Sequence, residues 1–162
     1  MARVYVAAGS NVDPLPHLEQ ALDELARRFG PLRVSPWYRN QAVGFSGDDF
    51  INLVLGFDTP RSVQETQAAL REVETLCGRP REAPKWAPRT MDLDILLYGD
   101  LVIAEPQLKL PRPDLLLRPY MLGPLADIAP ELVHPTEGRS IGELWARFDP
   151  AAHRMTAVRP GR

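Results

Sequence analysis

The chain has 162 residues, the length of one compact domain with a sizeable core, and its 44% hydrophobic and 25% charged residues are typical of globular proteins. A formal net charge of -2 argues against a nucleic-acid-binding surface. No segment approaches the roughly 20 uninterrupted apolar residues of a membrane span, and the N-terminus lacks the long apolar region of a signal peptide. Because Cys77 is the single cysteine, a disulfide framework is excluded. We expect one domain over residues 1–162, a cytoplasmic monomer without membrane or nucleic-acid partners.

The first part of the chain alternates between strand and helix patterns. A helix is predicted to begin at Asp13-Pro14, with Asp13 as its N-cap, and to end at Gly30 after a run of leucines at helical spacing. A second helix begins either at Thr59-Pro60 or at the capping-box pattern Ser62-x-x-Glu65, and it ends at Gly78. Runs of β-branched and aromatic residues predict strands at 3–8, 32–39, 51–58 and 91–98.

The resulting order, β-α-β-β-α-β, is the split βαβ arrangement of ferredoxin-like folds. We therefore predict an α+β protein with a ferredoxin-like core. Prolines multiply beyond residue 100, which predicts a C-terminal extension of loops and short helices, the latter at 119–128 and 140–148.

Two carboxylates, Asp92 and Asp94, are the sharpest chemical feature of the sequence. Residues two apart on a strand point to the same face, so these groups lie about 7 Å apart. At an effective dielectric constant of about 20 they repel by roughly 2 kcal/mol, which calls for a positive group between them. Mg²⁺ suits one or two carboxylates together with substrate phosphates. An arginine such as Arg89 is the alternative.

A basic segment leads into this strand. Its cations are Arg79, Arg81, Lys85 and Arg89, and Trp86 lies among them. Guanidinium and ammonium groups bind phosphate oxygens, while paired acids suit the metal that bridges phosphates. This combination is what phosphoryl transfer requires. A solvated basic loop with a structural tryptophan is the alternative interpretation.

The segment Trp86-Ala-Pro-Arg-Thr-Met-Asp-Leu-Asp-Ile95 resembles the signature of the 6-hydroxymethyl-7,8-dihydropterin pyrophosphokinase family. The resemblance extends over nearly the whole chain, through the segments Gly9-Ser10-Asn11, Tyr38-Arg39, Phe50-x-Asn52, Glu74-x-x-x-Gly78-Arg79, Arg118-x-Tyr120-Met121 and Ile128-Ala129-Pro130-Glu131-Leu132. It implies a ferredoxin-like fold and transfer of the pyrophosphoryl group of ATP to the pterin hydroxymethyl group. The products are AMP and the pterin diphosphate, in a step of folate biosynthesis.

The resemblance also implies roles for individual residues. Asp92 and Asp94 would hold two Mg²⁺ ions and act catalytically with Arg79 and Arg89, which brace the phosphates. Two aromatic rings would sandwich the pterin, and an amide would bind its polar edge. The implied pterin contacts are Asn40, Val43, Phe50, Asn52, Trp86 and Tyr120. The implied ATP contacts are Arg79, Arg81, Lys85, Trp86, Arg89, Ile95, Arg112 and Arg118.

The chain departs from the family pattern mainly on the nucleotide side. Glu82 stands where a basic residue is common, Ala87 replaces a glycine, and Arg71 replaces a frequent glutamine. The later segment reads Pro111-Arg112-Pro113, with Arg112 where the family usually has a histidine. Arg112 can contact phosphate or the adenosine hydroxyls, but it is a poor neutral hydrogen-bond partner.

Two other functions fit the residue pattern. A metal-dependent phosphohydrolase would use the same acids with water as the attacking group, but it needs no pterin sandwich. A ferredoxin-like binding or regulatory module without catalysis would leave Asp92 and Asp94 unexplained. The spacing of the three histidines does not predict a metal site.

Overall fold

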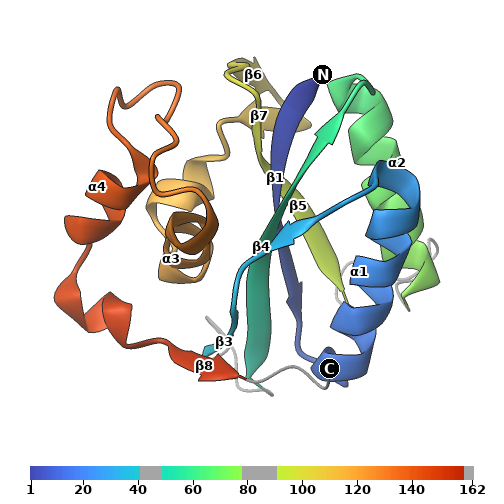
Figure 1. Ribbon diagram of the computed structural model, residues 1–162, viewed down its shortest axis with the longest axis horizontal. Coiled ribbons are helices and arrows are strands. Elements are labelled where there is room, and N and C mark those ends of the chain that lie inside the picture. Colours follow the sequence, from blue (N-terminus) through green and yellow to red (C-terminus); the bar gives the residue numbers. More distant parts are fainter. Residues whose placement is uncertain (41–48, 78–90, 159–162) are drawn as a thin grey trace.

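The computed structural model describes residues 1–40, 49–77 and 91–158. Within these ranges an antiparallel sheet, in the order β5-β1-β4-β3-β8, separates two helical layers (Figure 1). The strands of this sheet are β1 (Ala2–Ser10), β2 (Arg33–Val34, paired with β4), β3 (Trp37–Asn40), β4 (Phe50–Thr59), β5 (Asp92–Tyr98) and β8 (Thr156–Val158). The strands β6 (Ile103–Glu105) and β7 (Leu108–Leu110) form a separate hairpin.

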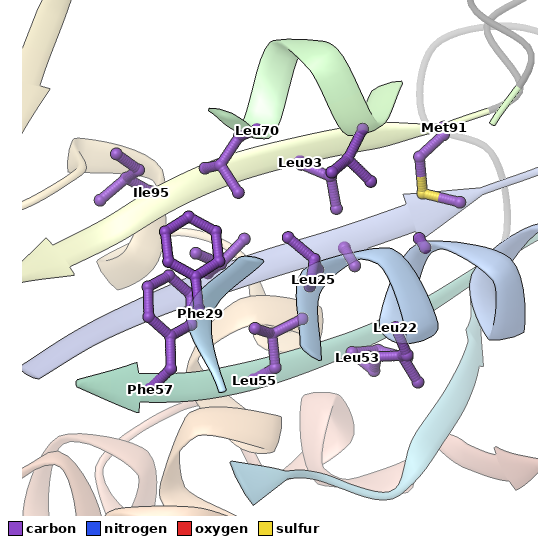
Figure 2. Close-up of a cluster of buried hydrophobic side chains, with 14 of the residues drawn as sticks. Leu22, Leu25, Phe29, Leu53, Leu55, Phe57, Leu70, Met91, Leu93 and Ile95 are labelled. Atoms are coloured by element: carbon purple, nitrogen blue, oxygen red, sulfur yellow. The ribbon is translucent and has the colours of Figure 1, made fainter. Parts of the chain in front are cut away.

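One face of the sheet is covered by α1 (Pro14–Phe29) and α2 (Val63–Leu76). Figure 2 shows the apolar side chains that fill this interface, from both helices and from β1, β4 and β5. Fully burying each large aliphatic or aromatic side chain stabilises the fold by about 1.5–3 kcal/mol. Phe29 of α1 stacks on Phe57 of β4 with ring centroids 4.1 Å apart, which fixes the end of the helix against the sheet.

The opposite face is covered by α3 (Pro119–Ile128), and α4 (Ile141–Ala146) packs against α3. Because side chains alternate along a strand, β1 directs Tyr5 and Ala7 to this layer while Val4 and Val6 face the other. Leu122 and Leu125 of α3 are buried against it. The sheet is therefore buried on both faces.

The strand–helix order confirms the predicted ferredoxin-like core, but the single strand predicted at 32–39 is wrong. It is interrupted at Ser35-Pro36 and forms β2 and β3 instead. The Ser35 hydroxyl accepts a hydrogen bond from the Val54 amide at 2.9 Å, and proline has no amide hydrogen to donate. Consequently, between the pairs Val34–Leu55 and Tyr38–Asn52 this segment has three residues where β4 has two.

The helix boundaries follow the capping residues only in part. At α2 the Ser62 hydroxyl accepts from the Glu65 amide and the Glu65 side chain accepts from the Ser62 amide, which selects the capping box over Thr59-Pro60. Asp13 does precede α1, but it has a left-handed backbone (φ 42°) and makes no side-chain cap.

The C-terminal part contains more regular structure than predicted. The helix at 119–128 is confirmed, whereas α4 is shorter than the predicted 140–148. The strands β6, β7 and β8 and two 3₁₀ turns (Pro113–Leu116 and Pro150–Arg154) were not predicted. None of the helices in the described ranges combines the length and apolar character needed to cross a membrane.

Candidate active site

A cavity of about 220 Å³, here called the strand-end cavity, opens where β5, β1 and β4 lie side by side. Strand register creates it, because Gly9 of β1 pairs with Asn52 of β4 on one side and with Asp92 of β5 on the other. The cavity is lined by Ala7, Ala8, Gly9, Asn40, Phe50, Asn52, Asp92, Asp94, Tyr120 and Met121. It therefore brings together predicted residues that lie far apart in the sequence.

The amide of Asn52 is the most buried polar group of this cavity. It is 8% exposed, and its Nδ2 donates to the Asn40 side-chain oxygen from the neighbouring strand β3. Gly9 makes room for it, since a Cβ at this position would lie 2.5 Å from the Asn52 side-chain oxygen. Gly9 is thus required by close approach rather than by a turn, a role that the sequence did not reveal.

Two aromatic rings line the same cavity from different elements. Phe50 begins β4, and Tyr120 lies in the first turn of α3. Burial raises the pKa of the Tyr120 hydroxyl, while the charge of Arg118 opposes this effect. The rings and the Asn52 amide together suit a flat molecule with a polar edge.

The two predicted acids, Asp92 and Asp94, both line the strand-end cavity and are half-buried. Burial raises the pKa of Asp94, and the nearby Asp92 adds to this rise, whereas Arg112 and Arg71 lower it. The Asp94 carboxylate is thus held in an environment that disfavours its charge unless a cation is close.

Asp94 also lines a smaller cavity of about 70 Å³, here called the side cavity. The other lining residues include Arg71 of α2, Ile95 of β5, Lys109 of β7 and Arg112, which follows β7. Arg112 and Ile95 were predicted on the nucleotide side, so Asp94 lies between the residues predicted for the pterin and two of those predicted for ATP.

The remaining predicted residues differ in what can be said of them. Arg118 immediately precedes α3, two residues before Tyr120, and its charge acts on the Tyr120 hydroxyl. The predicted site residues Val43, Arg79, Arg81, Lys85, Trp86 and Arg89 lie outside the described residues, as do the noted departures Glu82 and Ala87.

Glu74 of α2 is a residue of this region to which the sequence assigned no role. It is 3% exposed, and its Oε2 accepts from the Leu93 amide at 2.8 Å, midway between Asp92 and Asp94. The signal was present in the helical spacing, because Leu70, Val73 and Glu74 share a buried stripe. A carboxylate within such a stripe needs a polar partner.

The donor set of the cavity fits a magnesium ion supplied together with phosphates. No group of three or more His, Cys, Asp or Glu side chains that could hold a metal occurs among the described residues. Mg²⁺ takes one or two carboxylates when phosphates and water complete its octahedron, and the chemistry of Asp92 and Asp94 fits such a set.

Comparison with known proteins gives a consistent result. The family model for 7,8-dihydro-6-hydroxymethylpterin-pyrophosphokinase (HPPK) matches residues 5–130. A 2-amino-4-hydroxy-6-hydroxymethyldihydropteridine pyrophosphokinase of Synechocystis is 38% identical over 159 residues, covering 96% of this chain and 80% of the relative. A protein of the same name from Pseudomonas aeruginosa is 40% identical, covering 89% of this chain and 90% of the relative.

The fold matches solved structures of longer chains. A wild-type Plasmodium falciparum HPPK-DHPS with pteroate superposes with a TM-score of 0.75 at 13% identity, covering 91% of this chain and 44% of that one. A triple mutant of the same protein with SDX-DHP gives 0.74 at 16% identity, with the same coverage. This chain thus spans less than half of those chains, and at such identities the likeness concerns the fold alone.

Proposed function

The chain belongs to the 7,8-dihydro-6-hydroxymethylpterin-pyrophosphokinase family, and from this premise we propose which of its residues carry the reaction. The protein transfers pyrophosphate from ATP to the hydroxymethyl group of 6-hydroxymethyl-7,8-dihydropterin, which gives AMP and the pterin diphosphate in folate biosynthesis. The observation that carries the residue roles is the convergence of two rings, one buried amide and two acids on the strand-end cavity.

In this proposal the strand-end cavity binds the pterin. Phe50 and Tyr120 stack on the two faces of the bicycle, and Asn52 donates and accepts along its polar edge. Asn40 orients the Asn52 amide through their hydrogen bond, so the edge contact is fixed before the substrate arrives. The substrate's hydroxymethyl group then points toward Asp92 and Asp94.

Asp92 and Asp94 would hold two Mg²⁺ ions, which supply charge neutralisation at the phosphates and favour the ionised form of the attacking hydroxyl. The position of Asp94 supports this role, because Asp94 lines both the strand-end cavity and the side cavity. Ile95, Arg112 and Arg118 bind ATP in the proposal. So do Arg79, Arg81, Lys85, Trp86 and Arg89, with Arg79 and Arg89 bracing the transferred phosphates, while Val43 and Trp86 complete the pterin contacts.

The test is AMP release from ATP and Mg²⁺, with and without the pterin. We expect AMP only when the pterin is present, and a loss of at least about a hundredfold (about 2.7 kcal/mol) in Asp92→Asn and Asp94→Asn. Asp100→Asn is the matched control, because Asp100 is exposed in the turn after β5. Circular dichroism establishes that each variant is folded.

Two outcomes would overturn the proposal. ADP or inorganic phosphate released without pterin would assign a phosphohydrolase that uses the same acids. Wild-type turnover in Asp94→Asn would show that this carboxylate holds no catalytic metal.

A further inference from the structure

Arg112 lies between two carboxylates rather than against one. Its Nη1 is 3.6 Å from Asp94 Oδ1, and its Nη2 is 3.5 Å from Asp114 Oδ2. Both separations exceed the usual length of a charge-assisted hydrogen bond. The guanidinium is therefore held electrostatically by both acids and bonded tightly to neither.

The backbone, rather than the ion pairs, brings Arg112 to this place. The β1–β5 register shifts between Tyr5 and Val6, so Leu96 is an extra residue in β5. The Leu96 carbonyl accepts a hydrogen bond from the Arg112 amide at 2.9 Å. This backbone bond places the Arg112 side chain beside Leu96, two residues along β5 from Asp94, independently of the contacts that the guanidinium makes.

The Arg112 side chain also carries an unsatisfied donor. Its Nε is buried and has no hydrogen-bond partner within the described part of the chain, although the side chain is 35% exposed. A buried donor without a partner is costly. The position that Arg112 adopts here is therefore not one that satisfies all of its donors.

We propose that Arg112 is the resident counter-ion of Asp94, and that a divalent cation binds Asp94 in competition with it, the guanidinium shifting toward Asp114 as the cation arrives. Without bound phosphates to offset it, the repulsion between the Arg112 guanidinium and a divalent cation at the same half-buried carboxylate is weakly screened, so the two compete for Asp94. Asp114 provides the second position. This inference rests on the proposed role of Asp92 and Asp94 as metal ligands.

The inference predicts opposite changes in cation affinity for variants of Arg112 and of Asp114. Removing the guanidinium charge in Arg112→Gln frees Asp94, so Mn²⁺ binds about tenfold more tightly (about 1.4 kcal/mol). Removing the alternative carboxylate in Asp114→Asn leaves Arg112 on Asp94, so Mn²⁺ binds about threefold more weakly. Arg139→Gln is the matched control, because Arg139 is a half-exposed arginine paired with Glu143 instead.

In the experiment, Mn²⁺ is titrated into the full chain without nucleotide, up to millimolar Mn²⁺. Electron paramagnetic resonance measures the free Mn²⁺ at each step. The double variant Arg112→Gln/Asp114→Asn separates this mechanism from a general change of charge. If Asp114 acts through Arg112, Asp114→Asn has no effect in the Arg112→Gln background; a general field effect would add. Thermal melts check that each variant folds.

The outcomes separate this inference from the assignment on which it rests. The expected affinity order is Arg112→Gln, then wild type, then Asp114→Asn. Unchanged or undetectable Mn²⁺ binding in Arg112→Gln, or additive effects in the double variant, would overturn the inference. If Asp94→Asn abolishes binding in the same series, the metal assignment still stands. If Asp94→Asn leaves Mn²⁺ binding unchanged, both are wrong.

Discussion

Glu74 offers the sharpest test of how the acidic strand is held. Its Oε2 accepts from the Leu93 amide at 2.8 Å, and its Oε1 lies 3.2 Å from Arg71 Nη1. Glu74→Ala leaves the amide of a buried residue unpaired, which costs about 1–3 kcal/mol, and it removes packing as well. We expect the free energy of unfolding to fall by about 2–3 kcal/mol in Glu74→Ala.

Two variants separate the backbone contact from the ion pair. Glu74→Gln retains an acceptor oxygen for the Leu93 amide but loses the negative charge, and with it the ion pair to Arg71, so it should cost about 1 kcal/mol. Arg71→Ala removes an ion-pair partner whose side chain is 57% exposed, and it should cost no more than about 0.5 kcal/mol.

Urea unfolding followed by circular dichroism gives the three free energies, and amide exchange of Leu93 by NMR gives the local effect. We expect exchange at Leu93 to accelerate in Glu74→Ala and to stay near wild type in Arg71→Ala. If Glu74→Ala costs no more than Arg71→Ala, or if Leu93 exchange is unchanged, then Glu74 does not hold this strand and our reasoning is refuted.

Two further predictions concern the cavity and the C-terminal segment. Gly9→Ala should weaken pterin binding about tenfold in calorimetry, because the new Cβ displaces the Asn52 side chain; unchanged affinity would remove Asn52 from the pterin site. His134 Nδ1 accepts a hydrogen bond from the Thr136 amide at 3.2 Å, and burial lowers the pKa of the His134 imidazole. The neutral imidazole therefore stabilises the fold above the pKa of the unfolded state, about 6.5, and this contribution is lost as the pH falls toward the lower pKa of the folded state. Urea unfolding at pH 7 and pH 5 should show a smaller acid-induced loss in His134→Asn than in wild type, and equal losses would contradict this account.

The parts of the fold that sequence predicted depend on short-range rules. A spacing of two residues places Asp92 and Asp94 on one face of β5, and the capping box, one of two predicted starts of α2, places its N-cap at Ser62. Both signals are complete within a few residues. Neither requires knowledge of a distant partner.

The parts that sequence missed depend on partners far along the chain. The break between β2 and β3 arises from the Ser35 hydroxyl and the Val54 amide, 19 residues away. Glu74 is buried because the Leu93 amide faces it, a contact made 19 residues further along the chain. The strand-end cavity likewise exists only because strand register brings Gly9 beside Asn52.

Within the described residues β5 is an edge strand, and edges of this kind can slip in register or recruit a strand from another molecule. Two of its outward groups are already engaged, the Leu93 amide by Glu74 and the Leu96 carbonyl by the Arg112 amide. A slip of one residue would turn Asp92 and Asp94 into the apolar layer beneath α1 and α2. The contacts that blunt the edge against aggregation therefore also keep both acids facing the strand-end cavity.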